Sequence, residues 1–117
     1  MGDTTDNLVS ELRRGTLVLC VLCQLQDQQY GYSLKEQLAE YGIDIDQGTL
    51  YPLLRRLESR GLLDSEWTVT GSRPRCYYRL NATGQAAFDT LVYEWRNMVE
   101  AINHLLEERQ ENKNGPH

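Results

Sequence analysis

The spacing of apolar residues along the chain predicts a helix at each end, two shorter helices between them and one β-hairpin. Leucine and valine recur within Asn7–Leu25 often enough for a largely buried helix, although Thr16–Leu22 alone could also form a buried strand. The length of this segment favours the helix. A short helix is predicted over Leu34–Glu40, with Ser33 as its N-cap and Gly42 at its end.

The next segment, Asp44–Gly61, predicts a second short helix. Its apolar residues fall on one face at helical spacing: Leu50, Leu53, Leu54 and Leu57. Asp46 can cap the start of this helix and Gly61 can end it. Pro52 lacks an amide hydrogen and crowds the preceding turn, which leaves the exact start of the regular helix open. Two short helices joined by a tight turn are therefore expected.

After Leu63 the pattern changes from helical to alternating, which predicts a two-stranded hairpin. Trp67 and Val69 alternate with polar residues, Gly71–Pro74 has the composition of a turn, and residues 75–80 alternate again. A hairpin alone is marginally stable in water, so one of its faces must pack against the helices. The residues expected on that face are Trp67, Val69, Tyr78 and Leu80.

The last and longest helix is predicted from Asn81 or Thr83 to about Arg109. Alternating gaps of three and four residues separate its apolar positions, as in helices that pair with another helix: Phe88, Leu91, Trp95, Met98, Ile102 and Leu105. A second apolar row widens this stripe: Val92, Val99 and Leu106. Such a helix is about 40 Å long, more than a compact domain of this size can cover. The first row is therefore predicted to form a homodimer interface, and residues 110–117 are predicted to be a disordered tail.

The composition fits one globular domain, with 117 residues of which 40 % are hydrophobic and 25 % charged. The longest apolar run, Thr16–Cys23, is far shorter than the ~20 residues that cross a bilayer, and the N-terminal residues lack the order of a secretion signal. We therefore expect a cytoplasmic protein with no membrane partner. An odd number of cysteines, three, argues against a disulfide scaffold.

The net charge of −5 hides an uneven distribution of charge. Residues 1–50 carry three basic and eight acidic side chains and residues 81–117 carry three and six, whereas residues 51–80 carry six basic and three acidic side chains. A basic segment in an acidic chain can bind phosphate while the remaining surface suppresses non-specific adhesion. On charge alone, ordinary variation between surface segments explains this distribution as well as phosphate binding does.

The sequence offers little for catalysis, and neither an enzyme nor a cofactor or metal site is expected. The two histidines, His104 and His117, have no nucleophile beside them, and no glycine-rich phosphate loop is present. Cys20 and Cys23 have the spacing of a redox pair or half a zinc site. They lie in an apolar helical run without a second pair of ligands, which favours two buried thiols.

The succession of helix, turn, helix and hairpin is that of a winged helix-turn-helix, whose second helix enters the major groove of DNA. If the leucine face of that helix is buried, slim and polar residues face outward, and Arg55 and Arg56 can reach phosphates or guanines. Arg73 and Arg75 lie near the hairpin tip, where they can contact the neighbouring backbone or minor groove. The simpler alternative is a solvated helix face whose arginines pair with nearby glutamates.

Four motifs occur in order along the chain: Arg14–Leu17 (RGTL), Tyr30–Tyr32 (YGY), Gly48–Leu63 (GTLYPLLRRLESRGLL) and Arg73–Leu80 (RPRCYYRL). Together they resemble the PadR family of bacterial transcriptional regulators, over about residues 10–106. The single long helix that carries Trp95 is similar to that of the short, LmrR-like subgroup of multidrug-responsive repressors.

This resemblance implies a mainly α fold and a homodimeric repressor that binds double-stranded DNA at a palindromic operator. Residues 1–82 would form the winged helix-turn-helix DNA-binding domain, with a two-stranded β-wing, and residues 83–109 the long C-terminal dimerisation helix. The positions that match DNA-contacting elements of the family are Gln47, Thr49, Tyr51, Arg55, Arg73 and Arg75. Arg56 joins them because of its place on the outward helix face. The family usually has a basic residue where Cys76 stands, so weaker wing contacts are expected.

A small aromatic effector is a further implication of the LmrR-like resemblance. In that subgroup aromatic molecules lie between the two chains against a tryptophan of the last helix, a position taken here by Trp95, with Leu12, Met98 and Val99 as walls. The alternative, that Trp95 fills the dimer core, is favoured because aromatic residues in a helical stripe are usually core residues.

Two functions other than gene repression also stay open. A protein-interaction adaptor could use the same winged fold without touching DNA. A thiol redox-sensing regulator would need Cys20, Cys23 or Cys76 to be exposed and acidic.

Overall fold

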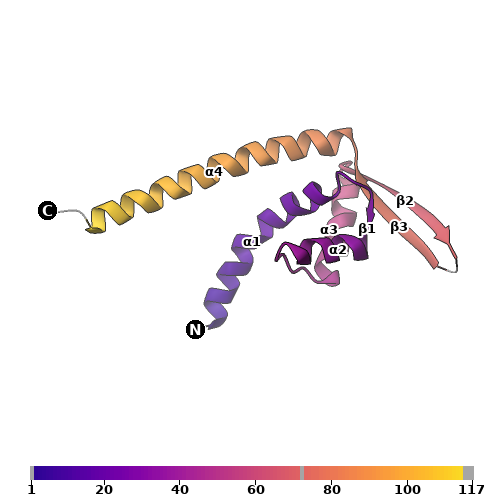
Figure 1. The fold of residues 1–117 in the computed structure, drawn as a ribbon, viewed down its shortest axis with the longest axis horizontal. Helices are drawn as coiled ribbons and strands as arrows, with labels where there is room; N and C mark the ends of the chain where they lie inside the picture. Colours follow the sequence, from indigo (N-terminus) through magenta and orange to yellow (C-terminus); the bar gives the residue numbers. More distant parts are fainter. Residues whose placement is uncertain (1, 72, 115–117) are drawn as a thin grey trace.

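A computed structural model describes residues 2–71 and 73–114, which form a mainly helical winged helix-turn-helix with a long C-terminal helix. The elements are α1 (Gly2–Gln24), β1 (Gln29–Tyr30), α2 (Gly31–Glu40), α3 (Gln47–Ser59), β2 (Leu63–Thr70), β3 (Arg73–Leu80) and α4 (Ala82–Asn114). Helices α2 and α3 and the sheet form one compact body, from which the free ends of α1 and α4 diverge (Figure 1). The longest dimension is 71 Å. The fold class expected from the sequence is confirmed.

The core lies where α1, α2, α3 and the base of the hairpin meet. Its buried residues come from each of these elements and from the turn before α3: Val21, Leu22, Leu25, Leu34, Leu38, Ile45, Leu50, Leu53, Leu54, Leu57, Leu63 and Tyr78. The leucine face predicted for α3 is therefore buried. Burying one such side chain contributes about 1.5–3 kcal/mol, so this face holds α3 in place while its other side stays free.

Short-range hydrogen bonds define the ends of α3, as its sequence predicts. Asp46 is the N-cap, and its Oδ1 accepts a hydrogen bond of 2.7 Å from the backbone N–H of Thr49. At the other end Gly61 adopts φ 80°, and the N–H of Leu62 donates to the carbonyl of Leu57 at 3.0 Å. Pro52 lies inside α3, and the helix nevertheless begins at Gln47.

The N-cap predicted for α2 is wrong. The helix starts at Gly31, Tyr30 is its N-cap, and Ser33 lies within the first turn. The hydroxyl of Ser33 donates backward to the carbonyl of Tyr30 at 2.8 Å, so it does not accept from the free N–H groups of the helix.

The sheet has three antiparallel strands in the order β1-β3-β2. Strands β2 and β3 form the predicted hairpin, with Leu63 opposite Leu80 and Trp67 opposite Cys76. Strand β1 was not predicted because two residues show no periodicity. It pairs with Tyr77 and Tyr78 of β3, and thereby ties the hairpin to the start of α2.

Only the base of the hairpin packs against the helices. Tyr78 is buried and Leu80 half-buried, whereas Trp67 is 68 % and Val69 75 % exposed. The prediction that all four residues lean on the helices is therefore wrong for Trp67 and Val69. Figure 1 shows the reason, since β2 and β3 extend well beyond the ends of the helices.

The two long helices also differ in extent from the prediction. Helix α4 continues to Asn114, so residues 110–114 are helical, and residues 115–117 of the predicted tail lie outside the described residues. Helix α1 is buried only in its C-terminal half, because residues 3–16 are exposed. No helix within the described residues has the length and apolar character needed to cross a membrane.

Candidate nucleic-acid interface

Helix α3 presents its polar side to solvent. Four of the predicted contact residues are exposed there: Gln47, Thr49, Arg55 and Arg56. Neither arginine forms an ion pair with any residue that the structure describes, and Glu58 instead accepts a hydrogen bond from the hydroxyl of Ser65. The alternative of arginines paired with glutamates is therefore not observed, and both guanidinium groups are available to phosphates or bases.

Tyr51 differs from these four residues because it is half-buried. Its ring packs on Gly31, where a Cβ would overlap the ring and lie 2.8 Å from the phenol oxygen. Gly31 is the first residue of α2, so this contact joins the two helices of the helix-turn-helix. The sequence analysis predicted Tyr51 only as an outward DNA contact. Its packing on Gly31 also gives it a structural role in the motif.

The wing has two unlike faces. Adjacent residues of a strand point to opposite sides, so Arg73, Arg75 and Arg79 share one face, and Trp67 and Tyr78 belong to the other. Arg73 and Arg75 are both exposed, as expected. The guanidinium carbon of Arg75 lies 5.0 Å from the ring centroid of Tyr30, a cation–π contact that sequence analysis missed because β1 was not predicted.

Polar contacts fix the wing relative to α3. Ser65 in β2 donates a hydrogen bond to Glu58 in α3. The pKa of the Tyr78 phenol is raised to about 12, mainly by burial, with smaller contributions from the hydrogen bond and charge of Cys76 and from the charge of Glu58, while Arg55 lowers it. The base of the wing therefore lies against the side of α3 that carries Arg55 and Glu58.

Helix α4 is anchored at its start and exposed along most of its length. The carbonyl of the Asn81 side chain accepts from the N–H of Gly84 at 2.8 Å, and its amide donates to the carbonyl of Gly61 at 3.0 Å. Phe88, the first residue of the predicted dimer row, packs on the core of its own chain. The other five residues of the predicted dimer row are 38–62 % exposed: Leu91, Trp95, Met98, Ile102 and Leu105.

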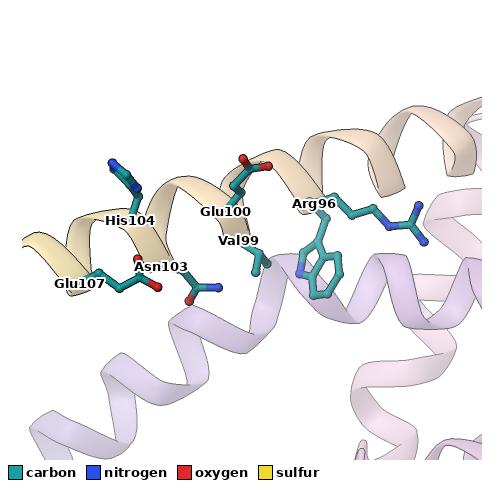
Figure 2. A pocket seen from close by; sticks show the side chains of 7 residues that line it. Arg96, Val99, Glu100, Asn103, His104 and Glu107 are labelled. Carbon is teal, nitrogen blue, oxygen red and sulfur yellow. The ribbon is translucent and has the colours of Figure 1, made fainter.

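Two hollows lie beside α4. A groove of about 680 Å³ runs between α1, the end of α2 and α4, and its lining includes Cys20, Phe88, Val92 and Trp95. A shallower depression of about 340 Å³ is lined by Trp95 and by the residues that Figure 2 labels, among which Val99 and Asn103 point toward α1 and Glu100 and His104 point away from it. Of the four predicted ligand contacts, Trp95 lines both hollows and Val99 one, whereas Leu12 and Met98 line neither.

The cysteines are not the two buried thiols that were predicted. Cys23 is exposed and Cys20 half-buried, because this part of α1 borders the groove, and both thiols are free. Burial raises the pKa of the Cys20 thiol, and the neighbouring Cys23 adds to this shift, so Cys20 is less acidic than an ordinary thiol. Within the described part of the chain, no three potential metal ligands cluster together.

Comparison with known proteins decides the family. Residues 18–90 match the transcriptional regulator PadR-like family. The transcriptional regulator Rv3488 of Mycobacterium tuberculosis is 40 % identical over 97 residues, which cover 82 % of this chain and 88 % of that protein. The chain belongs to the PadR family of transcriptional regulators.

Solved structures of PadR proteins share the same fold. A PadR family transcriptional regulator from Eggerthella lenta is 48 % identical, with a TM-score of 0.85 over 91 % of this chain and 95 % of that one. A PadR-like transcriptional regulator from Bacillus cereus is 26 % identical, with a TM-score of 0.75 over 83 % and 97 % of the two chains. Family membership makes DNA-binding regulation of transcription the function of this PadR protein, and its relatives are regulators rather than enzymes.

Proposed function

We propose that two copies of this PadR protein form a homodimer that binds a palindromic operator in the cytoplasm and represses transcription. The exposed apolar row of α4 carries the proposal: Leu91, Trp95, Met98, Ile102 and Leu105. The projecting half of α1 adds three more exposed apolar side chains: Leu8, Val9 and Leu12. Burying apolar surface gains about 25 cal/mol per Å², and contiguous apolar patches on soluble proteins mark interfaces.

A two-fold dimer would place two copies of α3 on one face of a duplex. The helices would then enter major grooves about 34 Å apart, or a multiple of that spacing, which requires a palindromic operator. In this arrangement Gln47, Thr49 and Arg55 face the bases and Arg56 the phosphates. Arg73 and Arg75 on the wing contact the flanking backbone. The resemblance of the chain to LmrR-like repressors supports repression rather than activation.

Selection from a random DNA pool tests this proposal. The purified protein is mixed with random duplexes, the bound fraction is sequenced, and the mass of the free protein is measured by light scattering. The proposal predicts enrichment of a sequence with two inverted half-sites and a mass of twice the 13.5 kDa of one chain. A protein that enriches no sequence, as expected for a protein-interaction adaptor, or that binds as a monomer, would contradict it.

Relief of repression by a small aromatic effector is the second part of the proposal. The 680 Å³ groove supports it, since its volume is that of a small-molecule site and Phe88, Trp95 and Tyr41 line it. Because the groove is bordered by both α1 and α4, a molecule bound there would change the angle between them and thus the spacing of the two α3 helices. Planar aromatic compounds should release the selected duplex from the protein and should fail to do so in the Val92→Trp variant, whose added ring fills the groove. If no compound of such a panel changes DNA binding, this part is wrong.

A further inference from the structure

Helix α1 places two thiols on the wall of the groove of about 680 Å³. Cys20 and Cys23 are three positions apart, so they lie on the same side of the helix, and both line the groove. Their proximity also shows in the pKa of Cys20, which Cys23 helps to raise. The DNA contacts and the dimer proposed above use neither thiol. A nucleophile on the wall of a cavity of this size indicates a site of covalent modification.

The two thiols differ in their access to solvent. Cys23 is exposed, whereas Cys20 is half-buried and has a raised pKa, which leaves less of its reactive thiolate form at neutral pH. Cys23 is also the next-to-last residue of α1, at the end that packs on the core. The apolar side chains that α1 adds to the proposed dimer lie at its opposite, free end. Cys23 is therefore the thiol that a compound entering the groove can reach.

The remaining lining of the groove indicates the chemistry of such a compound. Aromatic walls come from Tyr41, Phe88 and Trp95, which favours a planar ring system. Arg96 lines the same groove, forms no ion pair with a described residue, and extends along α4 toward the start of that helix (Figure 2). A free cation stabilises an oxygen on which negative charge develops. Quinones combine a flat ring, carbonyl oxygens and a ring carbon that a thiol attacks.

We propose that Cys23 is a covalent modification site for planar quinones bound in this groove. The sulfur of Cys23 adds to a ring carbon of the quinone, an S–C bond forms as the C=C π bond breaks, and the electron pair moves to the conjugated carbonyl oxygen. The thiol proton goes to that oxygen, and the hydrogen of the attacked carbon goes to the second oxygen as the ring becomes aromatic. The product is a hydroquinone bonded to sulfur, so the step needs no other oxidant or reductant. Arg96 favours the step because negative charge develops on the oxygen.

The modification site deepens the effector control proposed above, and its consequence for DNA binding rests on that proposal. A compound that binds without a covalent bond leaves the groove when its free concentration falls. An adduct on Cys23 keeps the groove filled, so the change in the angle between α1 and α4 would persist.

Mass spectrometry of the protein treated with naphthoquinone tests the site. Rates of addition are divided by those of iodoacetamide, a small thiol reagent that needs no groove, which corrects for differences in exposure. The corrected rate at Cys23 should be about tenfold higher than at Cys76, which lies in β3 outside the groove, because binding holds the quinone beside the thiol. Val92→Trp fills the groove and should remove this advantage. Val99→Trp adds the same ring to α4 outside the groove and should keep it.

Anisotropy with the duplex selected from the random pool measures the consequence for DNA binding. After free naphthoquinone has been removed by gel filtration, the treated wild type should bind the duplex about tenfold more weakly than the untreated wild type. Treated Cys23→Ser should bind as tightly as untreated Cys23→Ser.

The outcomes separate the modification site from the proposed function. Equal corrected rates at Cys23 and Cys76, or an unchanged rate in Val92→Trp, would overturn the inference. A protein that loses two hydrogens and gains no ring has formed a disulfide between Cys20 and Cys23, which also overturns it. The mass measurement needs no DNA, so it decides the inference even if the wild type selects no duplex and the proposed function fails. If Cys23 carries the adduct and the duplex stays bound, the site stands and the effector control is wrong.

Discussion

Replacement of Arg73 by alanine should weaken binding to every duplex and flatten its salt dependence. Arg73 is exposed at the start of β3, and no ion pair or ring contact holds its side chain in the described structure. Arg75 lies on the same face, but its guanidinium already rests over the ring of Tyr30. No described residue therefore competes with a phosphate for the guanidinium of Arg73, which makes Arg73 the cleaner test of the wing.

The size of the effect follows from the number of wings. A dimer has two, so the substitution removes two phosphate contacts, and the slope of log affinity against log salt falls by about 1.8. Between about 50 and about 200 mM salt, log salt rises by ~0.6. The ratio of wild-type affinity to variant affinity should therefore fall about tenfold over this range. The variant is expected to be much weaker than the wild type at low salt and close to it at high salt.

Fluorescence anisotropy with the selected duplex and with an unrelated duplex of equal length measures both slopes. Arg109→Ala is the matched control, because Arg109 is an exposed arginine on the end of α4 that lies farthest from the wing (Figure 1). Its slope should equal that of the wild type. If Arg73→Ala also keeps the slope of the wild type, the wing does not contact phosphates and the reasoning is wrong.

Three other substitutions test the dimer, the fold and an ionisable group. Trp95→Glu puts a charge in the proposed interface and should reduce the mass from light scattering to that of one chain; an intact dimer would refute the interface. Gly84→Ala places a Cβ against the backbone carbonyl of Leu62 and should cost about 1–3 kcal/mol in urea unfolding, whereas wild-type stability would refute the close contact. Because burial raises the pKa of Tyr78 to about 12, the folded state holds this proton more tightly than the unfolded state. Stability should therefore fall between about pH 10 and 12. The Tyr78→Phe variant has no ionisable phenol at this position, so it should not show this part of the loss of stability. Identical profiles of stability against pH for the variant and the wild type would contradict this.

The features predicted well from the sequence are those set by residues close together in the chain. The leucines of α3 repeat within two turns, and the Asp46 cap acts across three residues. This helix can therefore be predicted from its own sequence. Strand β1 and the N-cap of α2 were missed for the opposite reason. Two residues become a strand only because β3 lies beside them, and Ser33 bonds backward because α2 starts directly after that strand.

The candidate interface shows the same division between local and long-range effects. Arg55, Arg56, Arg73 and Arg75 were predicted to be exposed from periodicity and turn composition, and all four are. The packing of Tyr51 on Gly31 joins residues 20 positions apart, and no local pattern indicates it. The exposure of Trp67 depends on how far the helices reach beneath the hairpin, which is a property of the folded body. The alternating pattern predicted which face of the hairpin carries Trp67, but it did not predict that this side chain is exposed.

Hydroxyl-radical footprinting of the complex on the selected duplex, with the mass of the same complex measured in solution, tests the central claim most directly. The account predicts two chains per duplex and two protected half-sites related by a two-fold axis, about 34 Å or a multiple of it apart. One chain per duplex with a single asymmetric protected patch would contradict it.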